Sequence, residues 1–201
     1  MRGAIAAIIL AAGYSSRMGA FKPLLPFGAT TVLERSIDLF RAAGIDDIRV
    51  VVGHRADELL PLLARRQVQP LLNARYQEGM FSSVVTAAAS LERASKAFFL
   101  LPVDFPLVRQ ETVELLVRAY QGAAVNILYP ACRGQRGHPL LLATSYRDVI
   151  LSWQGNGGLR ALLKQYQGDA ATIETGDEGI LLDMDTPEDY ERLQDALPKI
   201  K

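Results

Sequence analysis

Short apolar runs that alternate with amphipathic stretches constrain the fold of this chain more than any other feature of its sequence. Runs rich in Ile, Val, Leu and Phe occupy residues 5–10, 48–52 and 96–101. Each is far shorter than the ~18 apolar residues of a membrane-spanning helix. Strands that are apolar at nearly every position are typical of a parallel sheet covered by helices on both faces. We therefore expect an α/β fold.

The stretches between these runs predict the remaining elements. Thr30 or Thr31 is a suitable cap for a helix that Gly44 is well placed to end. Residues 132–139 are rich in turn-forming side chains and interrupt the regular alternation. Further helices are expected over 57–65, 80–91, 111–120, 145–153, 159–165 and from Pro187, and further strands over 70–72, 125–129, 139–143, 171–174 and 179–182.

Composition limits the partners and the setting of the protein. The chain has 201 residues, 49% of them hydrophobic, without a repeat or linker, and we expect one domain over residues 1–201. Lys plus Arg equals Asp plus Glu at 22 each, which disfavours nucleic acid as a partner. The only cysteine, Cys132, excludes an internal disulfide and fits a reducing compartment. With no apolar segment long enough for a membrane span, we expect a cytoplasmic protein.

The segment after the first expected strand is a candidate phosphate-binding loop. In an open parallel sheet, ligands bind beyond the carboxyl ends of the strands, and small residues there let backbone amides approach a phosphate. Arg17 and Lys22 add two cations that suit the charge of a triphosphate. The glycine patterns of P-loop NTPases and of dinucleotide-binding folds are both absent. The candidate nucleotide-binding residues of this loop are Leu10, Ala11, Ala12, Gly13, Ser15, Ser16, Arg17 and Lys22.

Aspartates after two other expected strands are candidate metal ligands. Asp104 follows the run 96–101, and Asp183 and Asp185 follow the run 179–182. In an extended segment, side chains two residues apart lie on one face, so Asp183 and Asp185 would point the same way. Magnesium prefers one or two carboxylates together with water and phosphate oxygens. Residues 185–189 also have the composition of a helix start, and both interpretations can hold together.

Five motifs occur in a fixed order along nearly the whole chain, and together they resemble a known family. They are ILAAGYSSRMG at 9–19 followed by Lys22, the segment 73–83, Asp104 with Pro106, Gly137-His138-Pro139, and the acidic segment 183–189. This set is similar to the nucleotidyltransferases related to molybdenum cofactor biosynthesis, and most similar to the molybdenum cofactor cytidylyltransferases. Their guanylyl branch more usually has a second glycine before Gly13, where this chain has a double alanine, so the resemblance favours CTP over GTP.

The resemblance implies a fold and a set of roles. The fold is a Rossmann-like three-layer α/β/α arrangement with a mostly parallel mixed sheet, of the nucleotide-diphospho-sugar transferase type. Residues 1–110 would form the nucleotide-binding half and residues 111–201 the acceptor-binding half. Arg17, Lys22 and Asp104 would be catalytic, and Asp104 with Asp185 would bind Mg²⁺ or Mn²⁺, with Asp183 as a further ligand or substitute. The nucleobase would contact Asn73, Gly79, Ser82 and Ser83, and the acceptor would contact Gly137, His138 and Pro139.

Each of these assignments has a purely structural alternative. Ser82 or Ser83 would also suit an ordinary helix start, and Asn73 a turn. The imidazole of His138, between Gly137 and Pro139, either faces the phosphate of a pterin or hydrogen-bonds its own turn.

The resemblance also implies a reaction, the transfer of CMP from CTP to the phosphate of molybdopterin with release of pyrophosphate. The partners would then be a nucleoside triphosphate, a molybdopterin-type acceptor and a molybdenum hydroxylase apoenzyme. Two alternatives stay open. One is a transferase for another nucleotide or for a sugar or alcohol phosphate. The other is a non-catalytic chaperone that delivers finished molybdenum cofactor to a molybdenum hydroxylase.

Overall fold

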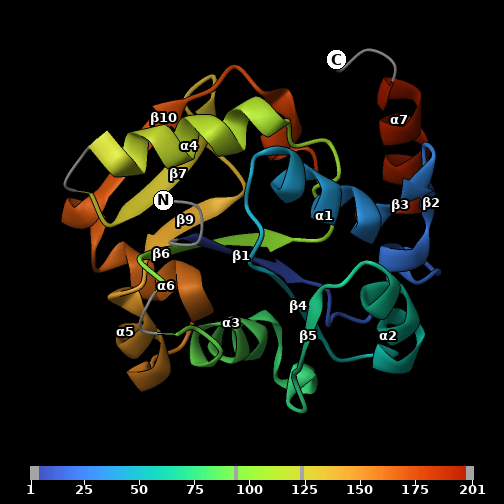
Figure 1. Ribbon diagram of the computed structural model, residues 1–201, viewed down its shortest axis with the longest axis horizontal. Helices are drawn as coiled ribbons and strands as arrows, with labels where there is room; N and C mark the ends of the chain where they lie inside the picture. The colour runs from blue at the N-terminus through green and yellow to red at the C-terminus, as the bar shows by residue number, and fades with distance from the viewer. Residues whose placement is uncertain (1–4, 93–94, 123–124, 198–201) are drawn as a thin grey trace.

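A computed structural model describes residues 5–92, 95–122 and 125–197, and it shows a central sheet between two layers of helices (Figure 1). Neighbouring strands pair in parallel except around β9, which is antiparallel to both β6 and β7, and around β8, which pairs antiparallel with β7. The expectation of a mostly parallel mixed sheet is confirmed. The strand order is β10-β7-β9-β6-β1-β4-β5. The strands are β1 (Ile5–Leu10), β4 (Ile48–Val52), β5 (Gln69–Leu72), β6 (Ala97–Pro102), β7 (Ile127–Cys132), β8 (Gln135–Arg136), β9 (Leu140–Ala143) and β10 (Ala170–Glu174).

The helices cover both faces of this sheet and give the expected three layers. One face packs against α1 (Val32–Ala42), α2 (Ala56–Arg65), α4 (Gln110–Gly122) and α7 (Pro187–Ala196). The other face packs against α3 (Met80–Ala89), α5 (Tyr146–Ser152) and α6 (Gly158–Lys164). Within the described residues, no helix combines the length and the apolar character that crossing a membrane requires.

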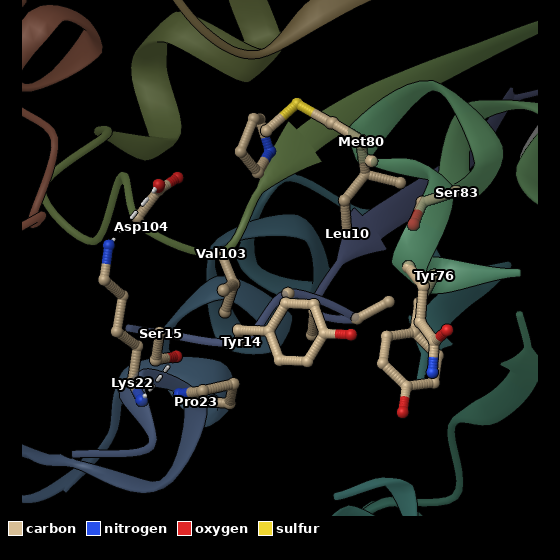
Figure 2. A pocket seen from close by; sticks show the side chains of 16 residues that line it. Leu10, Tyr14, Ser15, Lys22, Pro23, Tyr76, Met80, Ser83, Val103 and Asp104 are labelled. Carbon is tan, nitrogen blue, oxygen red and sulfur yellow. Dashed lines mark hydrogen bonds and ion pairs between the residues drawn. The ribbon is translucent and has the colours of Figure 1, made fainter. Parts of the chain in front are cut away.

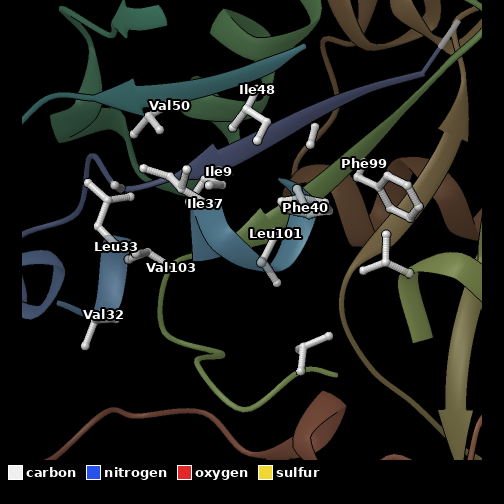
Figure 3. Packing of buried hydrophobic residues seen from close by; sticks show 14 of the residues in the cluster. Ile9, Val32, Leu33, Ile37, Phe40, Ile48, Val50, Phe99, Leu101 and Val103 are labelled. Atoms are coloured by element: carbon white, nitrogen blue, oxygen red, sulfur yellow. The ribbon is translucent and has the colours of Figure 1, made fainter. Parts of the chain in front are cut away.

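The central strand β1 explains why the apolar runs show no alternation. Ala7 and Ile9 belong to the core on the α1 face, whereas Ala6 and Ile8 belong to the core on the α3 face. All four side chains are fully buried, so both faces of the strand need apolar residues. Figure 3 shows Ile9 packed in the first of these cores with side chains of α1, β4 and β6.

Two helix starts carry the capping signals that the sequence contains. Thr31 accepts a hydrogen bond from the amide of Glu34, whose carboxylate accepts one from the amide of Thr31. Thr186 and Asp189 form the same reciprocal pair at the start of α7, with Pro187 as its first residue. Such a capping box satisfies amides that have no partner within the helix. The interpretation of residues 185–189 as a helix start is therefore confirmed.

The prediction of a strand over residues 179–182 is wrong. This segment is a 3-10 helix, η4 (Glu178–Leu181), which begins where the buried side chain of Asp177 accepts a hydrogen bond from the amide of Gly179. The backbone of Gly179 packs so closely that a Cβ atom there would lie 2.1 Å from the carbonyl oxygen of Leu107. The apolar side chains of η4 fill the core beside β7 and β8, and the segment itself does not pair with the sheet.

Candidate active site

The expected phosphate loop leaves β1 in the middle of the sheet, between β4 and β6. The amide of Ala11 donates to the carbonyl of Val51 at 2.9 Å, and the amide of Val103 donates to the carbonyl of Leu10 at 3.1 Å. The end of β1 is thus held on both sides. Beyond it, Ser15 has a left-handed backbone with φ of 56°, and its hydroxyl accepts a hydrogen bond from the amide of Lys22 at 3.1 Å. These contacts fold the loop back beside the strand end.

Backbone amides in this loop have no acceptor among the described residues. The amides of Ala11 and Met18 are both hydrogen-bonded, but none of the six amides of residues 12–17 between them donates to a described residue. The side chains of residues 13–17 are mostly exposed, so the loop is open to solvent. Successive free amides in a turn are a common anion-binding arrangement. The loop therefore has the backbone groups that a phosphate chain requires.

A cavity of about 390 Å³ opens over this loop (Figure 2). Its volume lies in the range of small-molecule binding sites. Arg17, Ser16, Asn73, Ser82 and Asp185 do not line it. The predicted site residues that do line it are Leu10, Ala11, Ala12, Gly13, Ser15, Lys22, Gly79, Ser83 and Asp104. Most of the nucleotide-binding prediction thus converges on one cavity, although the segments come from β1, α3 and the end of β6.

Lys22 lies between two of the predicted metal ligands. Its ammonium Nζ donates to Asp185 Oδ1 at 2.6 Å and is 3.9 Å from Asp104 Oδ2. The other carboxylate oxygen of Asp185 is 2.7 Å from Nη2 of Arg17. The side chain of Lys22 is 10% exposed and that of Arg17 is 69% exposed, so only the first pair is substantially shielded from water. Asp185, from the far end of the chain, therefore holds both cations of the phosphate loop.

Asp104 is a partly buried carboxyl group with spare hydrogen-bonding capacity. Its Oδ1 atom is buried and has no hydrogen-bond partner among the described residues. Burial raises the pKa of Asp104, and the nearby charges of Asp185 and Asp183 raise it further, whereas Lys22 lowers it. The backbone carbonyl of Asp104 accepts a hydrogen bond from the amide of Met184 at 2.9 Å, which fixes the acidic segment 183–185 next to it.

This donor set fits a hard divalent cation. Within the described residues, no group of three or more His, Cys, Asp or Glu side chains is arranged around a common point. Magnesium and manganese do not need such a group, because water and phosphate oxygens complete their coordination. The unpartnered buried oxygen of Asp104, with Asp185 across the same ammonium, supplies the one or two carboxylates required. Asp183 is exposed and makes no ion pair in the described part of the chain.

The polar residues expected at the nucleobase form an internal network. The Nδ2 group of Asn73 donates to the hydroxyl of Ser82 at 2.8 Å and to that of Ser83 at 3.0 Å. Ser82 in turn donates to the carbonyl of Gly79. Asn73 and Ser82 are thus buried behind the cavity and hold Ser83 in place, while Ser83 and Gly79 line the cavity wall.

The segment predicted to bind the acceptor lies against η4. The amide of His138 donates to the carbonyl of Ile180 at 3.0 Å, and Gly137 packs there so tightly that a Cβ atom would lie 2.2 Å from that oxygen. The imidazole of His138 lies 4.6 Å from the ring of Phe105, the residue after Asp104. Burial lowers the pKa of His138 to about 4, and its buried Nδ1 has no partner among the described residues.

Several side chains that line the cavity were not predicted, and Tyr14, Tyr76 and Met80 are the largest of them. Tyr14 occupies the variable position of the phosphate-loop motif, and Tyr76 and Met80 flank Gly79. The exposed fraction is 49% for Tyr14 and 62% for Met80. The sequence has one signal for such a contact, the aromatic Tyr14 between the small residues Gly13 and Ser15. That this side chain is exposed in the cavity can be seen only in the folded chain.

This chain is similar along nearly its whole length to several known proteins. The molybdenum cofactor cytidylyltransferase of Escherichia coli (strain K12) is 29% identical over 188 residues, covering 93% of this chain and 94% of that protein. Nicotine blue oxidoreductase of Paenarthrobacter nicotinovorans is 28% identical over 199 residues, covering 94% and 96%. The molybdenum cofactor guanylyltransferase of Xanthomonas euvesicatoria pv. vesicatoria (strain 85-10) is 28% identical over 193 residues, covering 92% of each.

A solved structure has the same fold over nearly its whole length. Rv0371c of Mycobacterium tuberculosis H37Rv in complex with manganese is 25% identical, with a TM-score of 0.79, and the match covers 97% of this chain and 100% of that one. The expected nucleotide-diphospho-sugar transferase type of fold is thereby confirmed. Residues 7–171 match the profile of the MobA-like NTP transferase domain. The phosphate loop, the paired aspartates and the matched relatives lead to one conclusion: this chain belongs to the MobA-like NTP transferase family.

Proposed function

We propose that this protein transfers CMP from CTP to the terminal phosphate of molybdopterin, releasing pyrophosphate and forming molybdopterin cytosine dinucleotide. The observation that carries the proposal is the position of Lys22 within 4 Å of both Asp104 and Asp185, beside a loop of unpaired amides. Such a cluster suits a triphosphate with a divalent cation. The family match supports nucleotidyl transfer, and the 29% identical cytidylyltransferase supports this acceptor and nucleotide.

The chemistry requires positioning more than a protein nucleophile. A phosphate oxygen of the acceptor attacks the α-phosphorus of CTP, a new phosphoanhydride bond forms, and the bond from the α-phosphorus to the bridging oxygen of pyrophosphate breaks. The acceptor phosphate is already anionic near neutral pH, so no side chain has to deprotonate it. The loop amides and Lys22 bind the triphosphate, and Arg17 adds charge at its solvent side.

Asp104 and Asp185 are the residues that would hold Mg²⁺ or Mn²⁺. When bound, the cation would neutralise charge that develops on the phosphate oxygens. The manganese complex of Rv0371c supports a divalent cation in this fold. Asp185 pairs with Lys22 and Arg17, so these cations have to exchange the carboxylate for phosphate oxygens when substrate binds.

The choice of CTP rests on two features of the cavity. The double alanine before Gly13 is similar to the cytidylyl enzymes. In addition, the amide of Arg75 donates to Oδ1 of Asn73, which orients the Nδ2 group of Asn73 toward Ser83. Because the Ser83 oxygen accepts that hydrogen bond, its own proton is available as a donor. A donor at this position matches the O2 and N3 acceptors of cytosine.

The acceptor site is proposed around Gly137, His138 and Pro139, in the second half of a single domain. Because burial lowers the pKa of His138 to about 4, its imidazole is neutral near pH 7 and serves as a hydrogen-bonding group. We place the reaction in the cytoplasm, where a single reduced thiol such as that of Cys132 is stable.

One experiment tests the function directly. Purified protein is incubated with Mg²⁺, molybdopterin and each of CTP, GTP, ATP and UTP, and pyrophosphate and the dinucleotide product are measured. We expect product with CTP above all. Product with GTP instead would reassign the nucleotide, and no product from an intact acceptor would contradict the transferase proposal.

A chaperone that delivers finished cofactor to a molybdenum hydroxylase is the second candidate. It is kept because the resemblance extends over nearly the whole chain to a protein named as an oxidoreductase and not as a nucleotidyltransferase. Asp104→Asn separates the two functions, because a chaperone would deliver cofactor unchanged whereas a transferase would lose its turnover.

A further inference from the structure

An aromatic cluster borders the phosphate loop, and the phosphate and metal contacts proposed above do not use it. It consists of Tyr14, Phe21, His54 and Tyr76. The ring centroids of Tyr14 and Tyr76 are 5.4 Å apart, and those of Tyr14 and His54 are 4.9 Å apart. Phe21 lies behind His54 at 6.2 Å. Only Tyr14 and Tyr76 of this cluster line the cavity.

The surroundings hold these two rings at the cavity wall. A Cβ atom on Gly53 would lie 2.7 Å from Cβ of Tyr76 and 2.9 Å from Cβ of Ala12, so this glycine permits the η2 segment (Tyr76–Glu78) to pack onto the end of β4. The amide of His54 donates to the carbonyl of Ala12 at 3.1 Å, which places its ring under Tyr14. Tyr14 nevertheless remains 49% exposed. A supported aromatic ring exposed in a cavity is a typical ligand-contacting arrangement.

The cavity has two chemically different ends. Lys22, Ser15 and Asp104 lie together at one side in Figure 2, whereas Tyr76, Met80 and Ser83 lie at the other, with Tyr14 between them. A triphosphate bound at Lys22 would extend its sugar and base toward the aromatic side. The segment 137–139 does not line this cavity, which assigns the tyrosines to the nucleotide and not to the acceptor.

We propose that Tyr14 and Tyr76 form a stacking wall for the nucleobase of the substrate nucleotide. This inference rests on the proposed nucleotidyl transfer and adds the residues that supply base affinity. Stacking acts on the π-face that every base has, so these rings provide affinity without selecting the base. Selection is left to the hydrogen-bonding edge, where Ser83 lies. The two tasks are therefore carried by separate side chains of one cavity.

The test compares binding of CTP with binding of inorganic tripolyphosphate, which has the charges but no base. Dissociation constants are measured by calorimetry in Mg²⁺ for the wild type, Tyr14→Ala and Tyr14→Phe. We expect Tyr14→Ala to weaken CTP binding roughly 5- to 100-fold and to leave tripolyphosphate binding unchanged. Tyr14→Phe retains the ring and should bind CTP like the wild type. Leu72→Ala is the matched control, because Leu72 is 69% exposed but lies outside the cavity.

A second variant gives a spectroscopic reading of the same contact. The chain has one tryptophan, so Tyr14→Trp adds a single new fluorophore at the wall. We expect CTP, but not tripolyphosphate, to quench the added emission relative to the wild type.

The outcomes separate this inference from the proposed function. Unchanged CTP affinity in Tyr14→Ala, or an equal loss for CTP and tripolyphosphate, would overturn the stacking wall alone. If the wild type binds tripolyphosphate and CTP equally well, the base makes no contact and the wall is likewise overturned. If the wild type binds neither ligand, the proposed function fails and the inference fails with it.

Discussion

Replacing Asp185 by Asn should strengthen nucleotide binding in the absence of metal and weaken it in the presence of metal. Asp185 engages both Lys22 at 2.6 Å and Arg17 at 2.7 Å. A triphosphate that binds Lys22 and Arg17 has to break both ion pairs. Without a divalent cation, this leaves the Asp185 carboxylate without a positive partner. The substitution removes the competing charge, and it also removes a ligand of the cation. Its two effects therefore have opposite signs.

The size of the expected gain in CTP affinity without metal follows from how exposed Lys22 and Arg17 are. The pair with Arg17 contributes only about 0.2–1 kcal/mol, because the arginine is 69% exposed and water screens it. The ammonium of the shielded Lys22 loses an ionic acceptor and keeps a hydrogen bond to the neutral amide oxygen of Asn, a difference of about 1 kcal/mol. Together these give about 1–2 kcal/mol, which corresponds to a dissociation constant for CTP in EDTA lower by roughly 5- to 30-fold.

Calorimetric titration with CTP, once in EDTA and once in excess Mg²⁺, measures the dissociation constant under each condition and so tests both effects. Glu188→Gln is the matched control, since Glu188 is an exposed acid in the first turn of α7 and forms no ion pair within the described residues. It should leave both dissociation constants nearly unchanged. If Asp185→Asn binds CTP in EDTA no better than the wild type and this control, Asp185 does not restrain the two cations and the reasoning is refuted.

Three further predictions concern stability. Asp104→Asn should abolish turnover yet raise the unfolding free energy at pH 7, because burial raises the pKa of Asp104 above its unfolded value and so disfavours the ionised carboxylate in the folded state. Denaturant melts should show this gain shrinking as the pH falls, and a constant gain would contradict it. The pKa of His138 is about 4, against an ordinary value of 6.5, so between pH 6.5 and 4 the wild type should lose about 3 kcal/mol more stability than His138→Gln. Parallel pH slopes for the two proteins would disprove this. Gly137→Ala should lower the unfolding free energy by about 2–3 kcal/mol, because its Cβ atom would meet the carbonyl oxygen of Ile180 at 2.2 Å. Gly168→Ala, with nothing within 4 Å of its Cβ position, should leave the melting temperature nearly unchanged. Equal melting temperatures for the two variants would count against the close contact.

The middle of the sheet could be predicted because β1, β4 and β6 are buried on both faces and therefore contain continuous apolar runs. The capping residues at Thr31 and Thr186 likewise act locally and are readable from neighbouring residues. The rule that a short continuous apolar run forms a strand failed at η4, where such a run fills the core beside the sheet. Apolar composition specifies burial, but pairing with a neighbouring strand depends on contacts distant in sequence.

The site could be predicted only in part for a similar reason. Small residues and cations after β1 indicated a phosphate loop because their chemistry is local. The ion pair between Lys22 and Asp185 joins residues 163 positions apart, so no spacing rule could reveal it. The position of Tyr14 in the cavity depends on how the ends of β1, β4 and the η2 segment meet. Assignments of roles to the predicted residues stay predictions until binding and turnover are measured.

The contact between Lys22 and the final acidic segment has a consequence for biosynthesis of the protein. The strands β1, β4 and β6 can pair once the first hundred or so residues are available, but Asp185 and α7 come from nearly the last part of the described chain. The hydroxyl of Tyr190 then donates to the carbonyl of Pro26, so the late segment docks beside the early one. A ribosome-bound chain would therefore carry the two loop cations without their partner Asp185 until residue 185 has been added and has reached the loop. Termination between the codons of Asp104 and Asp185 would yield a chain that contains both loop cations but lacks the carboxylate that pairs with them at 2.6 and 2.7 Å.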